Sequence, residues 1–135
     1  MVHYDGLTFQ PSGETDPPLA RYHQEDDLVW AEFGGGRVRR GCLVGTCDGD
    51  GVLRFTYCMV LRNSEVVCGR STSTPELLED GRIRLTEQWE RYGPLAATGV
   101  SYLEQVHDVR PPTAGRSSIN ADGNELPAGS PRSDR

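Results

Sequence analysis

The chain has 135 residues, which is the size of a single domain. Hydrophobic residues make up 36% of it, and 14 basic against 20 acidic residues give a net charge of -6 at pH 7. This balance argues against a nucleic-acid-binding surface and against binding to anionic lipid, since both need basic side chains. The sequence has neither an apolar run long enough for a membrane-spanning helix nor a signal-peptide pattern at its start. We therefore expect a cytoplasmic protein with no nucleic-acid or membrane partner.

Residues 1–108 have the pattern of an all-β domain. Runs of β-branched, aromatic and aliphatic residues alternate with Gly, Asp, Asn and Pro, which mark turns. The predicted strands, in chain order, are 7–10, 19–24, 28–33, 37–47, 52–61, 65–74, 82–91 and 98–106. The segments 34–36 and 48–51 predict tight reversals, and 74–78 resembles one capped helical turn.

About eight antiparallel strands joined by short turns predict an up-and-down β-barrel, because closure removes the exposed edges of a sheet. The interior of such a barrel holds packed side chains or one small ligand. The composition changes near Pro111, after which the only large aliphatic residues are Ile119 and Leu126. That segment cannot bury enough apolar surface to offset its conformational entropy. We therefore expect a barrel over residues 1–108 and a disordered tail over residues 109–135.

The residue types exclude several kinds of chemistry. Every basic residue is arginine, so no lysine is present to form a Schiff base, anchor pyridoxal or contact phosphate in a P-loop. The four cysteines, Cys42, Cys47, Cys58 and Cys68, form no CxxC motif and have no histidine at zinc-ligand spacing. In a cytoplasmic chain we expect free thiols that pack as small apolar residues. We predict neither a metal nor a cofactor.

The alternation of side chains identifies a candidate interior site, because residues two apart on a strand share a face. In the strand predicted at 82–91, Glu87 lies on the same apolar face as Trp89. A buried carboxylate is costly unless it is paired. One face of the preceding strand carries Arg70 and Thr72, so we predict that Arg70 lies beside Glu87 inside the barrel.

This interior cluster has two interpretations. In the first, Glu87 and Arg70 form a structural ion pair that sets the strand register or fills one end of the barrel. In the second, they lie at the floor of an apolar ligand cavity, where a few polar groups orient the ligand. The other lining residues predicted for that cavity are Tyr22, Gln24, Tyr57, Thr72 and Trp89.

Two functions follow from the second interpretation. The first is a barrel that binds a small apolar or amphipathic molecule without chemistry. The alternative is a cofactor-free cyclase or isomerase of a bacterial specialised-metabolite pathway, in which Glu87 and Arg70 are catalytic. An apolar wall raises the pKa of a carboxyl group, so Glu87 could act as a general acid or base. The fold does not decide between the two functions, and a homodimer stays open as the assembly.

One group of motifs resembles a known family. The motifs are Tyr22-x-Gln24, Gly35-Gly36-x-Val38-x-x-Gly41-x-Leu43-x-Gly45 and Ser73-x-Pro75-Glu76-x-Leu78-x-Asp80-Gly81-Arg82-Ile83-x-Leu85-x-Glu87-x-Trp89. Over residues 6–106 the chain is similar to a small bacterial family of avidin-like barrels, whose members are often named N-acetylglutamate synthase. The resemblance implies a closed, eight-stranded antiparallel barrel. Residues 38–43 lack the loop with which acetyltransferases of the usual kind hold acetyl-CoA, and the apolar stretch 58–61 favours a hydrophobic ligand.

Overall fold

Eight β-strands make up the computed structural model, which describes residues 2–107. The strands are β1 (Thr8–Pro11), β2 (Leu19–Glu25), β3 (Leu28–Gly35), β4 (Val38–Cys47), β5 (Leu53–Leu61), β6 (Val66–Leu77), β7 (Ile83–Arg91) and β8 (Ala97–Gln105). A short 3-10 helix, Gly93–Leu95, precedes β8. All eight predicted strands are confirmed, with small shifts at their ends. The tail predicted for residues 109–135 lies outside the described residues.

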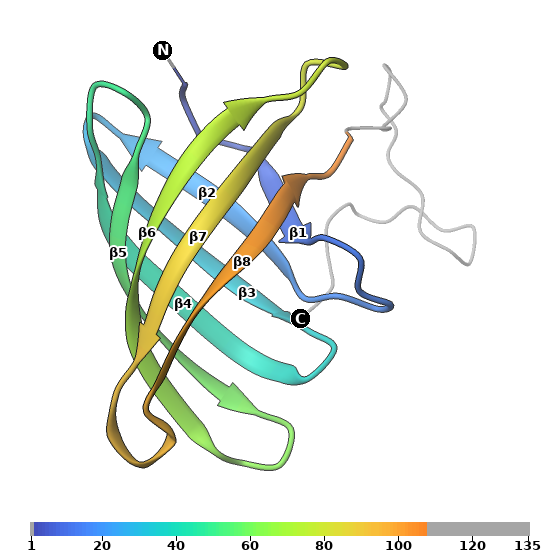
Figure 1. The fold of residues 1–135 in the computed structure, drawn as a ribbon, viewed down its shortest axis with the longest axis vertical. Coiled ribbons are helices and arrows are strands. Elements are labelled where there is room, and N and C mark those ends of the chain that lie inside the picture. Colours follow the sequence, from blue (N-terminus) through green and yellow to red (C-terminus); the bar gives the residue numbers. More distant parts are fainter. Residues whose placement is uncertain (1, 108–135) are drawn as a thin grey trace, which may run out of the picture.

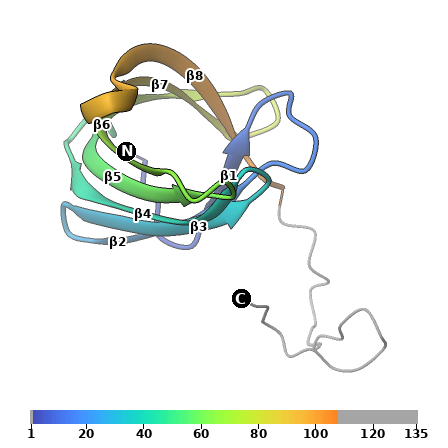
Figure 2. The same ribbon diagram turned by 90° about the horizontal axis from the view of Figure 1, so that it is seen from below.

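The strands form one closed antiparallel barrel (Figure 1). Each strand pairs with the next one along the chain, and β1 pairs with β8, so the sheet has no open edge. Figure 2, which views the barrel from below, shows the strands arranged around a common interior. The predicted all-β, up-and-down barrel is therefore confirmed, and its alternating side chains point either into this interior or into solvent.

The helical turn predicted at 74–78 is wrong. Strand β6 continues to Leu77, which pairs with Ile83 of β7. On the outer face of this ladder, Arg84 Nη2 donates to Glu76 Oε1 at 2.9 Å. The cross-strand contacts outweigh the local preference of this segment for a helix start, because the ladder satisfies the backbone along its whole length.

The N-terminal segment closes one end of the barrel. Tyr4 is fully buried, and its ring centroid lies 6.1 Å from those of Phe9 and Tyr22. Its hydroxyl donates to the carbonyl oxygen of Gly51 at 2.6 Å, and its backbone N–H donates to Gln24 Oε1 at 2.9 Å. The aromatic core of the protein therefore lies at this closed end.

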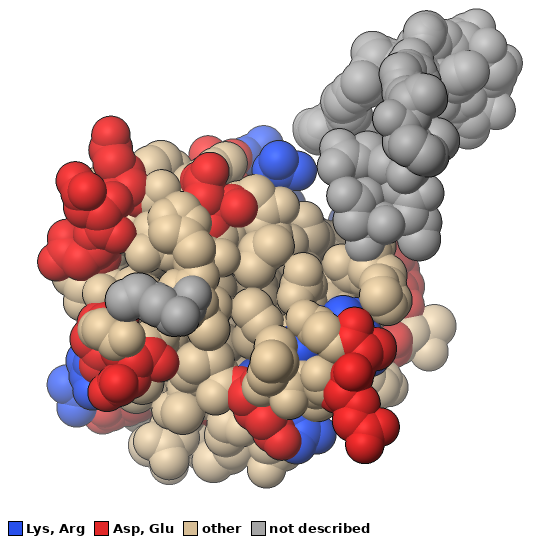
Figure 3. Space-filling view, turned by 90° about the horizontal axis from the view of Figure 1, so that it is seen from above, with Lys and Arg blue, Asp and Glu red and all other residues tan. Residues whose placement is uncertain are grey.

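The loops at the closed end carry much of the negative charge. Seen from above, Asp and Glu side chains surround an apolar centre (Figure 3). The loops between the paired strands at this end contain Asp26, Asp27, Asp48, Asp50, Glu79 and Asp80. Within residues 2–107 no group of three or more His, Cys, Asp or Glu side chains is placed to hold a metal ion. In the same range no helix is long and apolar enough to cross a membrane.

Candidate functional site

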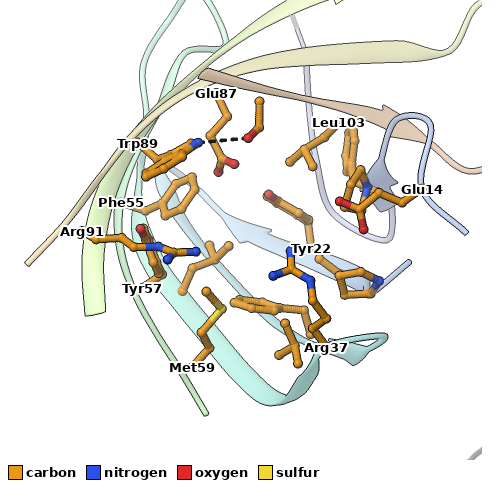
Figure 4. Close-up of a pocket in the computed structure, with 18 residues that line it drawn as sticks. Glu14, Tyr22, Arg37, Phe55, Tyr57, Met59, Glu87, Trp89, Arg91 and Leu103 are labelled. Atoms are coloured by element: carbon orange, nitrogen blue, oxygen red, sulfur yellow. Dashed lines mark hydrogen bonds between the residues drawn. The ribbon is translucent and has the colours of Figure 1, made fainter. Parts of the chain in front are cut away.

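A cavity of about 290 Å³ opens at the end of the barrel opposite the N-terminal segment (Figure 4). Its walls are mostly apolar and include Phe33, Leu43, Phe55 and Leu103. Tyr22, which belongs to the aromatic core, lies at its floor. A concave apolar space of this size fits one small molecule.

Small residues on β6 and β8 make room for large side chains on β7. Glu87 lies between its cross-strand partners Ser73 and Ser101, and Gly99 is a partner of Trp89. A Cβ atom at Gly99 would lie only 2.3 Å from Trp89 Cζ2, so no larger residue fits there without displacing the ring. The barrel therefore accommodates Glu87 and Trp89 on its inner face and still keeps an open cavity.

The carboxyl group of Glu87 lies inside the cavity, beside Trp89 (Figure 4). Burial raises its pKa to about 7, and the nearby Ser71 hydroxyl offsets part of that rise. No arginine or histidine among the described residues forms an ion pair with it. Glu87 is therefore an uncompensated carboxyl group that changes its protonation state near neutral pH.

Several hydroxyl groups lie on the same inner surface. Tyr22 points its hydroxyl towards Glu87 (Figure 4), and burial together with the Glu87 charge raises its pKa. The hydroxyls of Ser71 and Ser73 are also buried; that of Ser71 lies beside Glu87, whereas that of Ser73 has no hydrogen-bond partner within the described part of the chain. Neither Ser71 nor Ser73 is among the residues that line the cavity, whereas Glu87 and Tyr22 are, so it is these two groups that a bound molecule can reach.

Two arginines lie at the mouth of the cavity (Figure 4). The guanidinium of Arg91 packs over the ring of Trp89, 5.3 Å from its centroid. Arg37 follows the reversal between β3 and β4, where Gly35 and Gly36 have φ values of 120° and 57°, as the glycine run predicted. The opening thus carries two arginines together with the Glu14 carboxylate, whereas the deep part of the cavity holds the carboxyl group of Glu87.

The predicted pair between Glu87 and Arg70 is wrong, because Arg70 lies on the outer face of the barrel. Its side chain is 67% exposed, and its Nε donates to Glu90 Oε1 at 3.0 Å. The inward residues of β6 are instead Ser71 and Ser73. Large side chains from β5 and β7 already occupy the interior on both sides of β6, so the strand between them contributes small ones.

The outward position of Arg70 can be tested by the effect of its substitution on stability. We expect Arg70→Met to change the free energy of unfolding by less than about 1 kcal/mol, because an exposed ion pair contributes little. Urea denaturation of the variant and of Glu90→Gln, which removes the other partner, measures this. A loss of roughly 3 kcal/mol or more, as for a buried pair with one partner removed, would show that Arg70 points inward.

Two more predicted lining residues lie elsewhere. Gln24 anchors the N-terminal segment: its Oε1 accepts from the Tyr4 N–H, and its Nε2 donates to the Asp26 carbonyl oxygen at 2.9 Å. Thr72 shares the outward face of β6 with Arg70, since the buried serines lie on the other face. The predicted residues that the structure does place in the cavity are Tyr22, Tyr57, Glu87 and Trp89.

Neither arginine at the mouth was predicted from the sequence. Arg91 had a usable signal, since it lies two residues after Trp89 on the same face of one strand. No sequence signal marks Arg37, because this residue lies in a hairpin whose position over the opening depends on closure of the barrel. The buried serines were missed for a different reason: a serine is found on either face of a strand, so its type does not show which way it points.

A comparison with family models matches residues 2–106 to the family described as avidin-like protein. No curated protein and no solved structure matches the chain. The matched range contains all eight strands and every residue that lines the cavity. The chain therefore belongs to the avidin-like protein family, as its sequence motifs indicated.

Proposed function

We propose that this barrel binds one small apolar or amphipathic molecule in the cavity at its open end. The observation that carries the proposal is a space of about 290 Å³ with apolar walls that nevertheless contains the Glu87 carboxyl group, which forms no ion pair within the described residues, and the Tyr22 hydroxyl. Unpartnered polar groups destabilise a protein when they are removed from water. A ligand that pairs with them recovers that free energy on binding.

The arrangement of the cavity suggests how the ligand lies. An apolar body packs against Phe55 and Leu103, while a polar group reaches Glu87 and the Tyr22 hydroxyl. An acidic or polar end remains near the arginines at the mouth. An amphipathic molecule matches this distribution better than a uniformly apolar one.

Native mass spectrometry of protein purified from its own host tests the proposal. We expect a retained small molecule in the parent, and its loss in Ala20→Phe, because Ala20 lines the cavity and the added ring fills part of it. Thr56→Phe is the matched control, since Thr56 is exposed on the outer face of β5. Retention of the same molecule by Ala20→Phe, or its loss in both variants, would show that the cavity is not the binding site.

A cofactor-free cyclase or isomerase of bacterial specialised metabolism is the second candidate, and the pKa of Glu87 favours it. A carboxyl group with a pKa of about 7 can both accept and return a proton at neutral pH. Such a reaction is redox-neutral: Glu87 removes a proton from one atom of the bound substrate and returns it to another. Holding the substrate in a reactive shape lowers the barrier further. Arg70 takes no part in this scheme, because it lies on the outer face.

Product analysis separates the two candidates. If the protein is a cytoplasmic enzyme of this kind, incubation with the released ligand or its precursor yields an isomer of equal mass, and Glu87→Gln loses the conversion. Recovery of the added molecule unchanged from the parent protein would leave binding as the only function.

A further inference from the structure

Three of the four cysteines lie side by side on the outer face of the barrel. Cys42 on β4 is the register partner of Cys58 on β5, and Cys58 is in turn the partner of Cys68 on β6. Cys42 and Cys58 are exposed and Cys68 is half-buried, whereas Cys47 is buried in the core. The expectation that all four thiols pack as small apolar residues therefore holds for Cys47 alone.

Cys58 and Cys68 form a cross-strand pair without backbone hydrogen bonds between them. The N–H of Leu61 donates to the carbonyl oxygen of Glu65 across the β5–β6 hairpin, so the backbone polar groups of Leu61 face β6. Because these groups alternate in direction along a strand, those of Cys58, three residues earlier, face β4 instead. The carbonyl oxygen of Cys68 accepts from the N–H of Tyr92, away from β5. At such a pair the Cα atoms are about 4.5 Å apart, within the span of a disulfide. The two sulfur atoms are in contact at 3.1 Å.

The pair of Cys42 and Cys58 is placed less favourably. Because the Cys58 backbone points towards β4, these two cysteines form a hydrogen-bonded pair, in which the Cα atoms are about 5.5 Å apart and the side chains diverge more. Of the two neighbours that Cys58 has on this face, Cys68 is therefore the better partner.

We propose that Cys58 and Cys68 form a reversible disulfide by exchange with a low-molecular-weight disulfide such as that of glutathione. One cysteine thiolate attacks a sulfur of the small disulfide and displaces one small thiolate, which leaves a mixed disulfide on the protein. The other cysteine thiolate then attacks the protein sulfur of that mixed disulfide and displaces the second small thiolate. The cysteine pair is oxidised, the small disulfide is reduced to two thiols, and the protons of the cysteines pass to those thiols.

The reduced pair is the resting state in a cytoplasm. The hydrogen bond with Cys68 raises the pKa of the Cys58 thiol, so at neutral pH Cys58 is mainly protonated. A reducing compartment also keeps exposed thiol pairs in the reduced state. The pair therefore responds to an increase in the small disulfide and is not a permanent crosslink.

Peptide mapping of the full chain tests the proposal. Trypsin, which cleaves after arginine, separates the cysteines into three peptides, namely 41–54 with Cys42 and Cys47, 55–62 with Cys58, and 63–70 with Cys68. After incubation of the reduced protein with glutathione disulfide, we expect peptides 55–62 and 63–70 to be joined, with the loss of two hydrogen atoms. Dithiothreitol should separate them again.

Two serine variants give the matched comparison. Cys42→Ser should still form the crosslink, and its melting temperature should rise on oxidation by about 5–10 °C, as for the parent, because a disulfide restricts the unfolded chain. Cys68→Ser should form no crosslink and show no such rise. Three outcomes would overturn the proposal: a main crosslink between peptides 41–54 and 55–62, a main crosslink between two chains, or glutathione adducts on both cysteines without a crosslink.

Discussion

Glu87→Gln should make the free protein more stable at pH 8. The ordinary pKa of this carboxyl group is 4.5, and burial raises it to about 7 in the folded protein. Because the folded state holds the proton more tightly, the contribution of Glu87 to stability is fully present below pH 4.5 and is lost as the pH rises through 7. The complete loss corresponds to about 3 kcal/mol. Glutamine has the same shape and no charge to bury, so it avoids this loss.

Unfolding measured at two pH values checks this expectation. At pH 8 the variant should be more stable than the parent by roughly 2–3 kcal/mol, whereas near pH 4 the difference should nearly vanish. Glu32→Gln is the control, because the Glu32 side chain is 77% exposed and buries no charge, so this variant should not gain stability over the parent at pH 8. Equal stability of the Glu87 variant and the parent at pH 8 would mean that the carboxyl group remains in contact with water.

The Glu87→Gln variant also tests whether Glu87 takes part in ligand binding. If Glu87 holds the ligand, Glu87→Gln should lose about tenfold or more in affinity for the molecule recovered from the parent, since a hydrogen bond to a charged group contributes about 1.5–3 kcal/mol. Isothermal titration with that molecule measures the change. A variant that is stabilised and yet binds like the parent would show that Glu87 has no part in binding.

Tyr4→Ala should give the largest loss of stability, because it removes the aromatic side chain that closes the barrel. Tyr4 is fully buried, and truncation of a buried aromatic residue costs about 3–5 kcal/mol. Tyr4→Phe keeps the ring but leaves the Gly51 carbonyl oxygen without its donor, so it should cost about 1–3 kcal/mol.

Denaturation of the two Tyr4 variants beside His3→Ala measures these effects. His3 is exposed in the same segment, and its removal should change stability by less than about 0.5 kcal/mol. If Tyr4→Ala behaves like His3→Ala, the N-terminal segment does not close the barrel in solution.

The sequence by itself determined the number and order of the strands and the position of Glu87 on an inner face. Strand β7 alternates strongly, with Leu85 and Trp89 on one side and arginine and threonine on the other, so its inward face is defined locally. Turn residues separate the strands, and short connections make neighbours antiparallel. These features depend on contacts within one strand or hairpin, which is why they were predictable.

Only the tertiary structure decided which face of β6 points inward. Cys68, Arg70 and Thr72 alternate with Gly69, Ser71 and Ser73, and neither set is clearly apolar. The choice depends on the volume that the neighbouring strands leave free: a Cβ atom at Gly69 would lie 2.6 Å from the Tyr57 hydroxyl, so this side of the strand must carry small residues.

The role of Gln24 and the row of three cysteines on the outer face are likewise decided only in the assembled barrel. Gln24 meets Tyr4 through a hydrogen bond between residues 20 positions apart, and Cys42 meets Cys58 only through the register of β4 against β5. Alternation within a strand has a period of two and is visible in the sequence. The alignment of one strand with the next is set by side chains that pack together from distant parts of the chain, so it is decided only when the barrel closes.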